Sequence, residues 1–214
     1  MTTPAAYPAL PIKLHRFYLS GHSHRVELLL SLLKLPYELV DVNLAGRAHK
    51  QPEFLAMNPF GQVPVIQDGA VTLADSNAIL VYLASKYDRG LWLPREPAAA
   101  AAVQRWLSVA AGLLAFGPAT ARLATLFKAP VNAEEAMVHA NNLFTVMEGE
   151  LQASPFLAGN SPTLADIANY TYIAHAPEGN VSLDPYPRLR GWLQRIEALP
   201  DFVPMTKSAV GLAA

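Results

Sequence analysis

Hydrophobic and polar positions change period several times along the first 87 residues. The segment IKLHRFYL, which starts at Ile12, reads as a strand, and HRVELLLSLLKL after it has helical spacing up to Pro36. The apolar positions on one face of that helix are Val26, Leu29, Leu30 and Leu33. YELVDVNL then alternates and predicts a second strand, one side of which is formed by Val40, Val42 and Leu44. Strand, helix and strand in this order predict a parallel βαβ unit with a right-handed crossover.

A hairpin is predicted next, in VPVIQDGAVTLA. Asp68-Gly69 separates two short runs of β-branched residues, which is a strong pattern for a tight two-residue turn. The following DSNAILVYLASKY predicts a helix that begins with Asp75 or Ser76 as its N-cap. The buried stripe of this helix consists of Ile79, Leu80, Leu83 and Tyr87. The first domain is therefore predicted to run β-α-β, a loop, then β-β-α.

Gly and Pro residues interrupt the pattern in DRGLWLPREP, which we interpret as a linker between two domains. Beyond it the apolar spacing is helical throughout. One long helix is expected over residues 98–127 with a bend at Gly117-Pro118, and three more over 132–154, 163–176 and 186–199. The expected domain boundaries are 1–11 for a flexible leader, 12–87 for an α/β domain, 88–97 for the linker and 98–214 for an all-helical domain.

Composition argues against several classes of protein. The 214 residues are 52% hydrophobic and 15% charged, so the chain can bury a core and is not a disordered segment. The formal net charge of −1 gives no basic surplus for nucleic acid, and apolar runs such as VELLLSLLKL are too short to span a membrane. The start, MTTPAAYPALP, lacks the features of a signal peptide. Cysteine is absent, which excludes disulfides and a protein thiol nucleophile and favours an intracellular protein.

A polar cluster, Ser20–His24, lies where the first strand gives way to the first helix. His22 and His24 are two residues apart, whereas helical zinc pairs are spaced by about three or four, so a metal site is not expected. The serines are not part of a G-x-S-x-G elbow. Ser20 precedes a helix N-terminus, where a serine either caps the helix or donates a hydrogen bond to a bound anion.

Two further segments permit the same pair of interpretations. Pro64 opens the third strand, and a cis bond before it would leave the N–H and C=O groups of Val63 free to pair with an extended peptide. Asp75 and Ser76 either cap the third helix or hold an α-amino acid group, with its carboxylate on Ser76 and its ammonium group on Asp75. Together with Ser20, these segments can hold a small peptide that carries an anionic reactive atom.

These motifs follow the order found in the glutathione transferases, and the chain resembles that family from Ile12 onward. The motifs that carry the resemblance are S-x-x-S-x-R-V, HKQPEFLAMNPFGQVPVIQDG, L-A-D-S-N-A-I-L-x-Y-L and SPTLADIANY. The resemblance implies a thioredoxin-like α/β N-terminal domain followed by an all-α helical bundle, with glutathione as co-substrate and no metal. Ser20 then resembles the residue that hydrogen-bonds the glutathione sulfur. The glutathione-binding residues implied in the same way are His49, Lys50, Gln62, Val63, Pro64, Asp75 and Ser76.

Each of these residues takes a role from the resemblance. His49 and Lys50 resemble the pair near the glycine carboxylate, and Val63 resembles the main-chain partner of the cysteinyl unit, with Gln62 beside it. Asp75 and Ser76 resemble the γ-glutamyl clamp, and Ser23 is an alternative to Ser20 as the partner of the sulfur. The candidates for an electrophile pocket are His22, Trp106, Leu113 and Phe116, although Trp106, Phe116, Tyr172 and Trp192 are read first as core residues.

Thr163 and Asp166 form an S/T-x-x-D pattern before an apolar helix. We interpret them as a capping box, in which the Thr163 side chain caps the helix and Asp166 reaches back to the main chain. Asp166 is therefore assigned to folding and not to catalysis.

The resemblance implies a cytoplasmic, homodimeric detoxification enzyme that joins glutathione to a small electrophile. Nucleic acid and membrane partners are not expected. One alternative is a glutathione-dependent disulfide reductase or peroxidase on the same site; lacking cysteine, it would work through two bound glutathiones. The other is a non-enzymatic binding module with the same fold.

Overall fold

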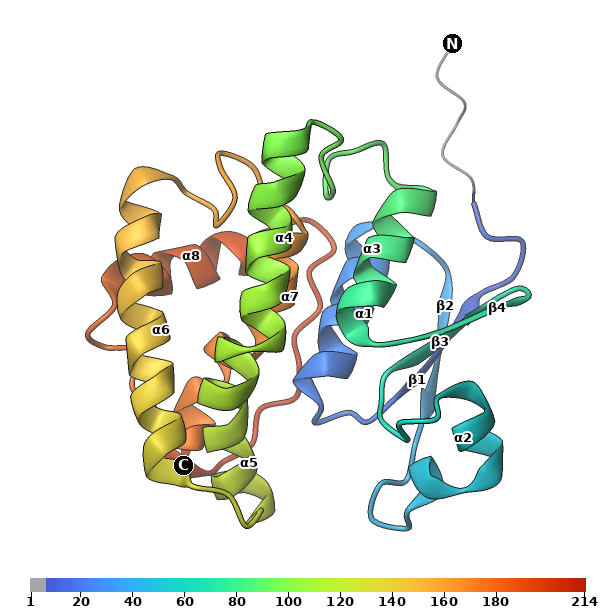
Figure 1. The fold of residues 1–214 in the computed structure, drawn as a ribbon, viewed down its shortest axis with the longest axis horizontal. Coiled ribbons are helices and arrows are strands. Elements are labelled where there is room, and N and C mark those ends of the chain that lie inside the picture. Colours follow the sequence, from blue (N-terminus) through green and yellow to red (C-terminus); the bar gives the residue numbers. More distant parts are fainter. Residues whose placement is uncertain (1–6) are drawn as a thin grey trace. The chain divides into compact units, whose positions relative to one another are not determined.

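The computed structural model describes residues 7–214, which form two compact units (Figure 1). The first unit comprises the chain up to Leu93 together with Pro200–Met205. The second comprises Pro94–Leu199 and Thr206–Ala214. The segment Pro200–Met205 thus belongs to a unit that is distant from it in sequence, which the hydrophobic pattern did not indicate.

Part of the expected flexible leader, residues 1–6, lies outside the described residues. Within the remainder, the Tyr7 hydroxyl donates a hydrogen bond to the Lys34 carbonyl oxygen at 2.7 Å. This contact ties the segment before the first strand to the end of the first helix.

The first unit contains four strands and two longer α-helices in the order that the sequence predicted, and a 3-10 turn and a short α-helix are added between the second and third strands. Its elements are β1 (Ile12–Arg16), α1 (Gly21–Leu32), β2 (Tyr37–Asp41), the 3-10 turn η1 (Ala48–Lys50), α2 (Pro52–Met57), β3 (Val65–Asp68), β4 (Val71–Ala74) and α3 (Ser76–Tyr87).

The four strands form one mixed sheet in the order β2-β1-β3-β4. β1 and β2 are parallel, as the βαβ pattern predicted, while β3 is antiparallel to both β1 and β4. In this register His15 lies opposite Val65, and Val65 lies opposite Ala74. The end of β1, the start of β3 and the end of β4 therefore meet at one edge of the sheet.

Helices cover both faces of this sheet: α1 and α3 lie together on one face and α2 lies on the other (Figure 1). On the α2 face, Val65 packs with Val42 and Phe54. Because side chains alternate along a strand, Leu14 and its partner Ile66 point to the opposite face, where both are fully buried. The predicted stripe of α3, Ile79, Leu80, Leu83 and Tyr87, is buried, and so are Val26, Leu29 and Leu30 of α1.

The predicted position of the hairpin turn is wrong by one residue. Asp68 is the last residue of β3 and pairs with Val71, so the two-residue loop is Gly69-Ala70. Gly69 has a φ of +59°, a conformation that glycine adopts without steric cost at the first position of such a loop. Asp68 stays in the strand because its buried carboxylate has partners elsewhere, on α3.

The short helix α2 and the turn η1 were read as a loop from the sequence. Each is too short for a helical period to emerge, and Pro52 at the first position of α2 reads in sequence as a breaker. Phe54 is the one buried residue of α2 and anchors it to the sheet. These elements place Lys50 near the loop that precedes β3.

The second unit is helical, and its first predicted helix is broken twice. Its elements are α4 (Pro97–Ala111), the π-helical turn η2 (Ala115–Ala119), α5 (Thr120–Phe127), α6 (Ala133–Ala153), α7 (Leu164–Ala174), the 3-10 turn η3 (Ala176–Gly179), α8 (Pro187–Glu197) and the 3-10 turn η4 (Gly211–Ala213). The expected bend at Gly117-Pro118 is present, since Gly117 has non-helical angles of φ −95° and ψ −106°. A Cβ atom on Gly117 would lie 2.9 Å from the Ala140 nitrogen of α6, so the break lets two main chains approach closely. The earlier break at Gly112 was not predicted.

By length and composition alone, the run Pro97–Phe127 is apolar enough to cross a membrane, contrary to the expectation that all apolar runs are too short. Its most apolar window is 28% buried within the structure. A single run of this kind is weak support for a membrane span, and Gly112 and Gly117 interrupt its helix.

The capping box at the start of α7 is confirmed. Thr163 Oγ1 accepts a hydrogen bond from the Ala165 N–H at 3.2 Å, and Asp166 accepts one from the Thr163 N–H at 2.8 Å. Asp166 is fully buried and also accepts hydrogen bonds from the Leu157 N–H at 2.9 Å and Trp192 Nε1–H at 2.8 Å. Asp166 therefore both caps the start of α7 and holds Trp192 of α8 in place.

Candidate functional site

The polar residues predicted to form a site lie along the sheet edge where β1 and β4 end and β3 begins. Ser20 follows β1, Pro64 directly precedes β3, and Ser76 is the first residue of α3 after β4. The pairing of His15 with Val65 and of Val65 with Ala74 brings these three segments together. The tertiary structure thus assembles residues that are separated by 56 positions, from 20 to 76, in the sequence.

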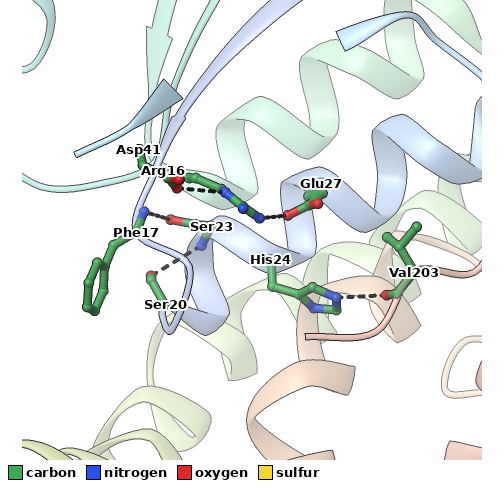
Figure 2. Close-up of polar contacts among 8 residues, drawn as sticks. All are labelled: Arg16, Phe17, Ser20, Ser23, His24, Glu27, Asp41 and Val203. Carbon is green, nitrogen blue, oxygen red and sulfur yellow. Dashed lines mark hydrogen bonds and ion pairs between the residues drawn. The ribbon is translucent and has the colours of Figure 1, made fainter. Parts of the chain in front are cut away.

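Ser20 is the N-cap of α1. Its Oγ accepts a hydrogen bond from the Ser23 main-chain N–H at 3.3 Å, so one lone pair of the hydroxyl serves the helix (Figure 2). The hydroxyl hydrogen has no acceptor among residues 7–214, and the side chain is partly exposed. Capping the helix and donating to an anion are therefore compatible functions of the same hydroxyl group.

The residues around Ser20 hold the strand-to-helix connection in place (Figure 2). Ser23 is fully buried, and its Oγ accepts the Phe17 N–H at 3.3 Å. A ring nitrogen of His24, Nε2, lies 2.8 Å from the Val203 carbonyl oxygen, which joins α1 to the segment Pro200–Met205 of the same unit. Ser23 and His24 are thus occupied by structural contacts.

Lys50 lies against the loop that leads to β3. Its Nζ donates to the carbonyl oxygens of Phe60 at 3.1 Å and Gly61 at 2.9 Å. Neighbouring His49 has a buried Nδ1 without a hydrogen-bond partner in the described part of the chain, and burial together with Lys50 and Arg47 lowers the pKa of its ring. An exposed ammonium group and a neutral imidazole are available here for a carboxylate.

The loop before β3 presents main-chain groups. The Val63–Pro64 peptide bond is cis, as the sequence suggested. The main chain of Val63 makes no hydrogen bond to any residue of 7–214. The buried side chain of Asn58 fixes the loop by donating to the Gln62 carbonyl oxygen at 2.8 Å. The Gln62 side chain itself is exposed.

Asp75 caps α3 from an unusual conformation. Its φ is +70°, which is uncommon for a residue other than glycine, and its Oδ1 accepts the Ala78 N–H at 2.9 Å. The second carboxylate oxygen remains available to a cation. Ser76 follows at the first position of the helix and is 5% exposed. A carboxylate and a hydroxyl group thus follow one another at the N-terminus of α3.

Sequence reasoning missed a residue behind Ser76. Arg25 of α1 is 1% exposed, and its Nη1 donates to Ser76 Oγ at 3.2 Å and to Asn77 Oδ1 at 2.9 Å. His22 Nδ1 lies 3.4 Å from the same Ser76 oxygen. Burial, and then the charge of Arg25, lower the pKa of His22 to about 3. The position of Arg25, directly after the polar cluster and before an apolar helical run, is the signal in the sequence that could have pointed to it.

The proposed pocket residues of the second unit differ in exposure. Trp106 is 2% exposed, and its Nε1 has no partner among the residues described, so its reading as a core residue is confirmed. Tyr172 and Trp192 are likewise buried. The same reading is wrong for Phe116, which is 67% exposed. It follows the buried Leu114 by two positions, about 200° around a helix, and so points away from the buried face. Leu113 is also exposed.

Metal-binding side chains do not gather in this unit or the other. Within residues 7–214, no group of three or more His, Asp or Glu side chains is arranged to hold a metal ion.

The fold and this site define a class: an α/β domain of thioredoxin-like topology that offers a serine, a cis-proline loop and a helix-capping Asp-Ser pair, followed by a helical domain. Residues 10–85 match the family described as "Glutathione S-transferase, N-terminal domain", and residues 102–200 match "Glutathione S-transferase, C-terminal domain". The chain therefore belongs to the glutathione transferase family.

Individual relatives agree with that assignment. "Glutathione S-transferase 3" of Zea mays is 37% identical over 90% of this chain and 91% of its own length. "Disulfide-bond oxidoreductase YfcG" of Escherichia coli is 31% identical over 84% and 87% of the two chains. The crystal structure of a glutathione S-transferase from Pseudomonas fluorescens superposes with a TM-score of 0.87 at 33% identity, covering 92% of this chain and all of that one.

Proposed function

We propose that the protein binds glutathione along the sheet edge and activates its thiol for attack on a small electrophile. The observation that carries this proposal is the Ser20 hydroxyl, which is partly exposed at the N-terminus of α1 and has its hydrogen free. The peptide-binding groups of Val63, Asp75 and Ser76 lie on the same edge. Glutathione is a co-substrate in this proposal, and no metal takes part.

Thiol activation follows from two features of Ser20. A free thiol has a pKa of ~8.5, so only a few per cent is thiolate at neutral pH, and the thiolate is the nucleophile. A hydroxyl donor and the partial positive charge of a helix N-terminus both stabilise the thiolate over the thiol. The proton leaves to solvent as the thiolate forms. The sulfur then bonds to a carbon atom of the electrophile, and the leaving group, such as chloride, departs to solvent with the electron pair of its broken bond.

The remaining glutathione groups have partners of suitable charge. We assign the glycine carboxylate to Lys50 and His49, and the cysteinyl main chain to Val63, beside Gln62 and Pro64. The γ-glutamyl group is assigned to the Asp75 carboxylate and the Ser76 hydroxyl. Each assignment pairs an ionic or main-chain group with a complementary one, as recognition of a small charged peptide requires.

The electrophile has fewer constraints. Of the sequence candidates, Trp106 belongs to the core, and we keep His22, Leu113 and Phe116 as candidate contacts, with Leu113 and Phe116 the more accessible because their apolar side chains are exposed. The apolar side chains of Leu113 and Phe116 favour an electrophile with an apolar ring or chain.

Calorimetric titration with glutathione, followed by a conjugation assay with a chloronitrobenzene, tests the proposal. We expect saturable binding and a rate that depends on glutathione and enzyme together. Binding without turnover across a broad panel of electrophiles would favour a non-enzymatic binding module. Absence of binding would overturn the proposal.

Disulfide reduction is a second candidate, because a relative with 31% identity is named a disulfide-bond oxidoreductase. The chain has no cysteine, so both thiols must come from glutathione. Two glutathione molecules would reduce one disulfide substrate to two thiols and form glutathione disulfide. Comparing turnover of a model disulfide with that of an electrophile under the same conditions decides between the two activities.

We further propose that the protein is a cytoplasmic homodimer. Exposed apolar side chains support self-association; they include Phe60 at 78%, Val138 at 58% and Val146 at 58% exposed. The lack of cysteine supports an intracellular location. Light scattering after gel filtration tests the mass in solution, and cell fractionation tests the location.

A further inference from the structure

One residue of α1 connects Ser20 to a segment from near the other end of the chain. The main-chain N–H of His24 donates to the Ser20 carbonyl oxygen at 2.9 Å, which closes the first turn of the helix. The side chain of His24 is 3% exposed, and its Nε2 lies 2.8 Å from the Val203 carbonyl oxygen (Figure 2). Because a carbonyl oxygen only accepts hydrogen bonds, Nε2 carries the hydrogen and donates it.

The segment Pro200–Met205, which receives this hydrogen bond, belongs to the same unit as α1 and is attached to that helix a second time. Ser31 Oγ donates to the Asp201 carbonyl oxygen at 2.7 Å. Ser31 follows His24 by about two helical turns, so the two side chains lie on the same face of α1. Of these two attachments, the one made by His24 is next to Ser20.

The first turn of α1 is weakly held by its own cap. Main-chain N–H groups in the first turn of a helix have no partner within the helix, and helix ends fray. Ser20 Oγ lies 3.3 Å from the Ser23 nitrogen, beyond the usual range of about 2.7–3.2 Å for such a hydrogen bond. A hydrogen bond also weakens steeply when its donor is misaligned. Motion of the first turn would therefore weaken the contact of the Ser20 hydroxyl with a bound thiolate.

We propose that His24 is the positioning residue of Ser20: by joining the first turn of α1 to the segment Pro200–Met205, it holds the Ser20 hydroxyl where the glutathione sulfur binds. The inference rests on the proposed function, because it deepens the role given there to Ser20. His24 bonds to the carbonyl oxygen of Ser20, and so leaves the hydroxyl hydrogen for the thiolate. The segment Pro200–Met205 then contributes to thiol activation without touching the sulfur.

Substitutions of His24 separate its hydrogen bond from its bulk. His24→Phe removes the donor and keeps a ring, His24→Gln keeps a donor as far from the main chain as Nε2 is, and His24→Asn has a shorter reach. Thiolate absorbance against pH gives the pKa of the bound glutathione thiol. Calorimetry gives the affinity for S-methylglutathione, which lacks the thiol hydrogen. Ser31→Ala is the matched control, because it removes the other hydrogen bond to the same segment.

We expect His24→Phe to raise the pKa of the bound thiol by about 0.5–1 unit, less than Ser20→Ala does, because the hydroxyl is still present. His24→Gln should titrate as the parent does, and His24→Asn should lie near His24→Phe. Affinity for S-methylglutathione should stay within about 2-fold of the parent, because the binding groups on β3 and α3 are unchanged. Ser31→Ala should leave the thiol titration where it is in the parent.

A double-mutant cycle shows whether His24 acts through Ser20. The Ser20→Ala protein has no hydroxyl to position, so adding His24→Phe to it should shift the thiol pKa by less than about 0.2 unit. A further shift as large as the one that His24→Phe causes in the parent would overturn the inference, since His24 would then act on the thiolate by another route.

The same titrations separate failure of this inference from failure of the proposed function. A bound thiol with the ordinary pKa of ~8.5 in the parent, or a titration that Ser20→Ala does not move, overturns the proposed function and this inference with it. A pKa that is lowered in the parent and unchanged in His24→Phe overturns the inference alone, and so does an equal shift in Ser31→Ala. If His24→Phe does not fold, equal titrations of His24→Gln and His24→Asn overturn it.

Discussion

Ser20 Oγ accepts a hydrogen bond from the main-chain N–H of Ser23 at 3.3 Å, while the Ser23 hydroxyl is turned inward to the N–H of Phe17. The two serines of the strand-to-helix connection thus have different surroundings. Ser20 is partly exposed with its hydrogen free, and Ser23 is fully buried. This difference favours Ser20 as the partner of a bound thiolate.

Ser20→Ala should raise the pKa of bound glutathione and slow conjugation at neutral pH. A hydrogen bond to a charged group is worth about 1.5–3 kcal/mol, so the rate should fall by roughly one to two decades. The loss of rate should shrink at higher pH, because hydroxide in solution then removes the thiol proton without help from the serine. Thiolate absorbance of the enzyme–glutathione complex against pH measures the shift directly.

Ser23→Ala is the matched control for that experiment. It removes the acceptor of the Phe17 N–H and should lower stability by ~1–2 kcal/mol without moving the thiolate titration. A titration that moves in Ser23→Ala and not in Ser20→Ala would reverse the two roles. If neither variant moves it, the helix N-terminus and main chain stabilise the thiolate without a serine.

Ser76→Ala should weaken glutathione binding more than it lowers the rate at saturation. The Ser76 hydroxyl is assigned to a part of glutathione that does not react, so its contribution is equal in the ground state and the transition state. Calorimetry should show a dissociation constant raised by about 10-fold or more, with kcat within about 3-fold of the parent. Normal affinity combined with a collapsed kcat would show that the role is wrong.

The capping box of α7 should carry a large share of the stability of the second unit. Thr163→Ala should cost ~1 kcal/mol of unfolding free energy, as the loss of an N-cap does. Asp166→Ala should cost more, about 3 kcal/mol, because it leaves the buried donors of Leu157 and Trp192 unsatisfied. Chemical denaturation measures both. Equal, small effects of the two variants would contradict the wider role of Asp166.

Stability should fall in acid partly because of His22. Its folded pKa is about 3, below the ordinary value of 6.5, so on acidification the unfolded chain takes up a proton first. The contribution of neutral His22 to the free energy of unfolding is fully present above pH ~6.5 and is lost progressively as the pH falls toward 3. Between pH 7.5 and 5.0 the loss attributable to His22 is at most ~2 kcal/mol.

Chemical denaturation of the parent and His22→Phe at these two pH values tests this. The variant should lose less stability on acidification than the parent. Equal losses in both proteins would mean that His22 titrates normally in the folded chain.

The β3–β4 hairpin provides a test of where its turn lies. Asp68 accepts hydrogen bonds from the Tyr82 hydroxyl at 2.8 Å, the Lys86 ammonium at 2.6 Å and the Tyr87 hydroxyl at 2.6 Å. Burial alone would raise the pKa of Asp68, but these partners lower it. Asp68→Ala should therefore cost about 3 kcal/mol, whereas Gly69→Ala should cost ~1 kcal/mol through its positive φ. If Asp68 were an exposed turn residue, Asp68→Ala would lower the thermal stability less than Gly69→Ala does.

The sequence by itself determined the kinds and the order of the strands and of the longer helices. The period of two in YELVDVNL and the helical stripe of α3 come from residues close in sequence, so local patterns suffice to predict them. The Thr163–Asp166 box is local for the same reason. Ser20, Pro64 and Ser76 were identifiable as candidates because each lies at a predicted boundary between elements.

Only the tertiary structure decided what surrounds those candidates. Asp68 left the predicted turn because its carboxylate finds partners on α3, and Phe116 is exposed because its side of the chain, opposite the buried Leu114, meets no other element of its unit. Arg25 lies 51 residues from Ser76 in sequence, and its contact with that serine depends on the packing of α1 against α3. Hydrogen bonds and burial between distant residues are set by how elements pack, and a periodic pattern records only which face is buried, not what it meets.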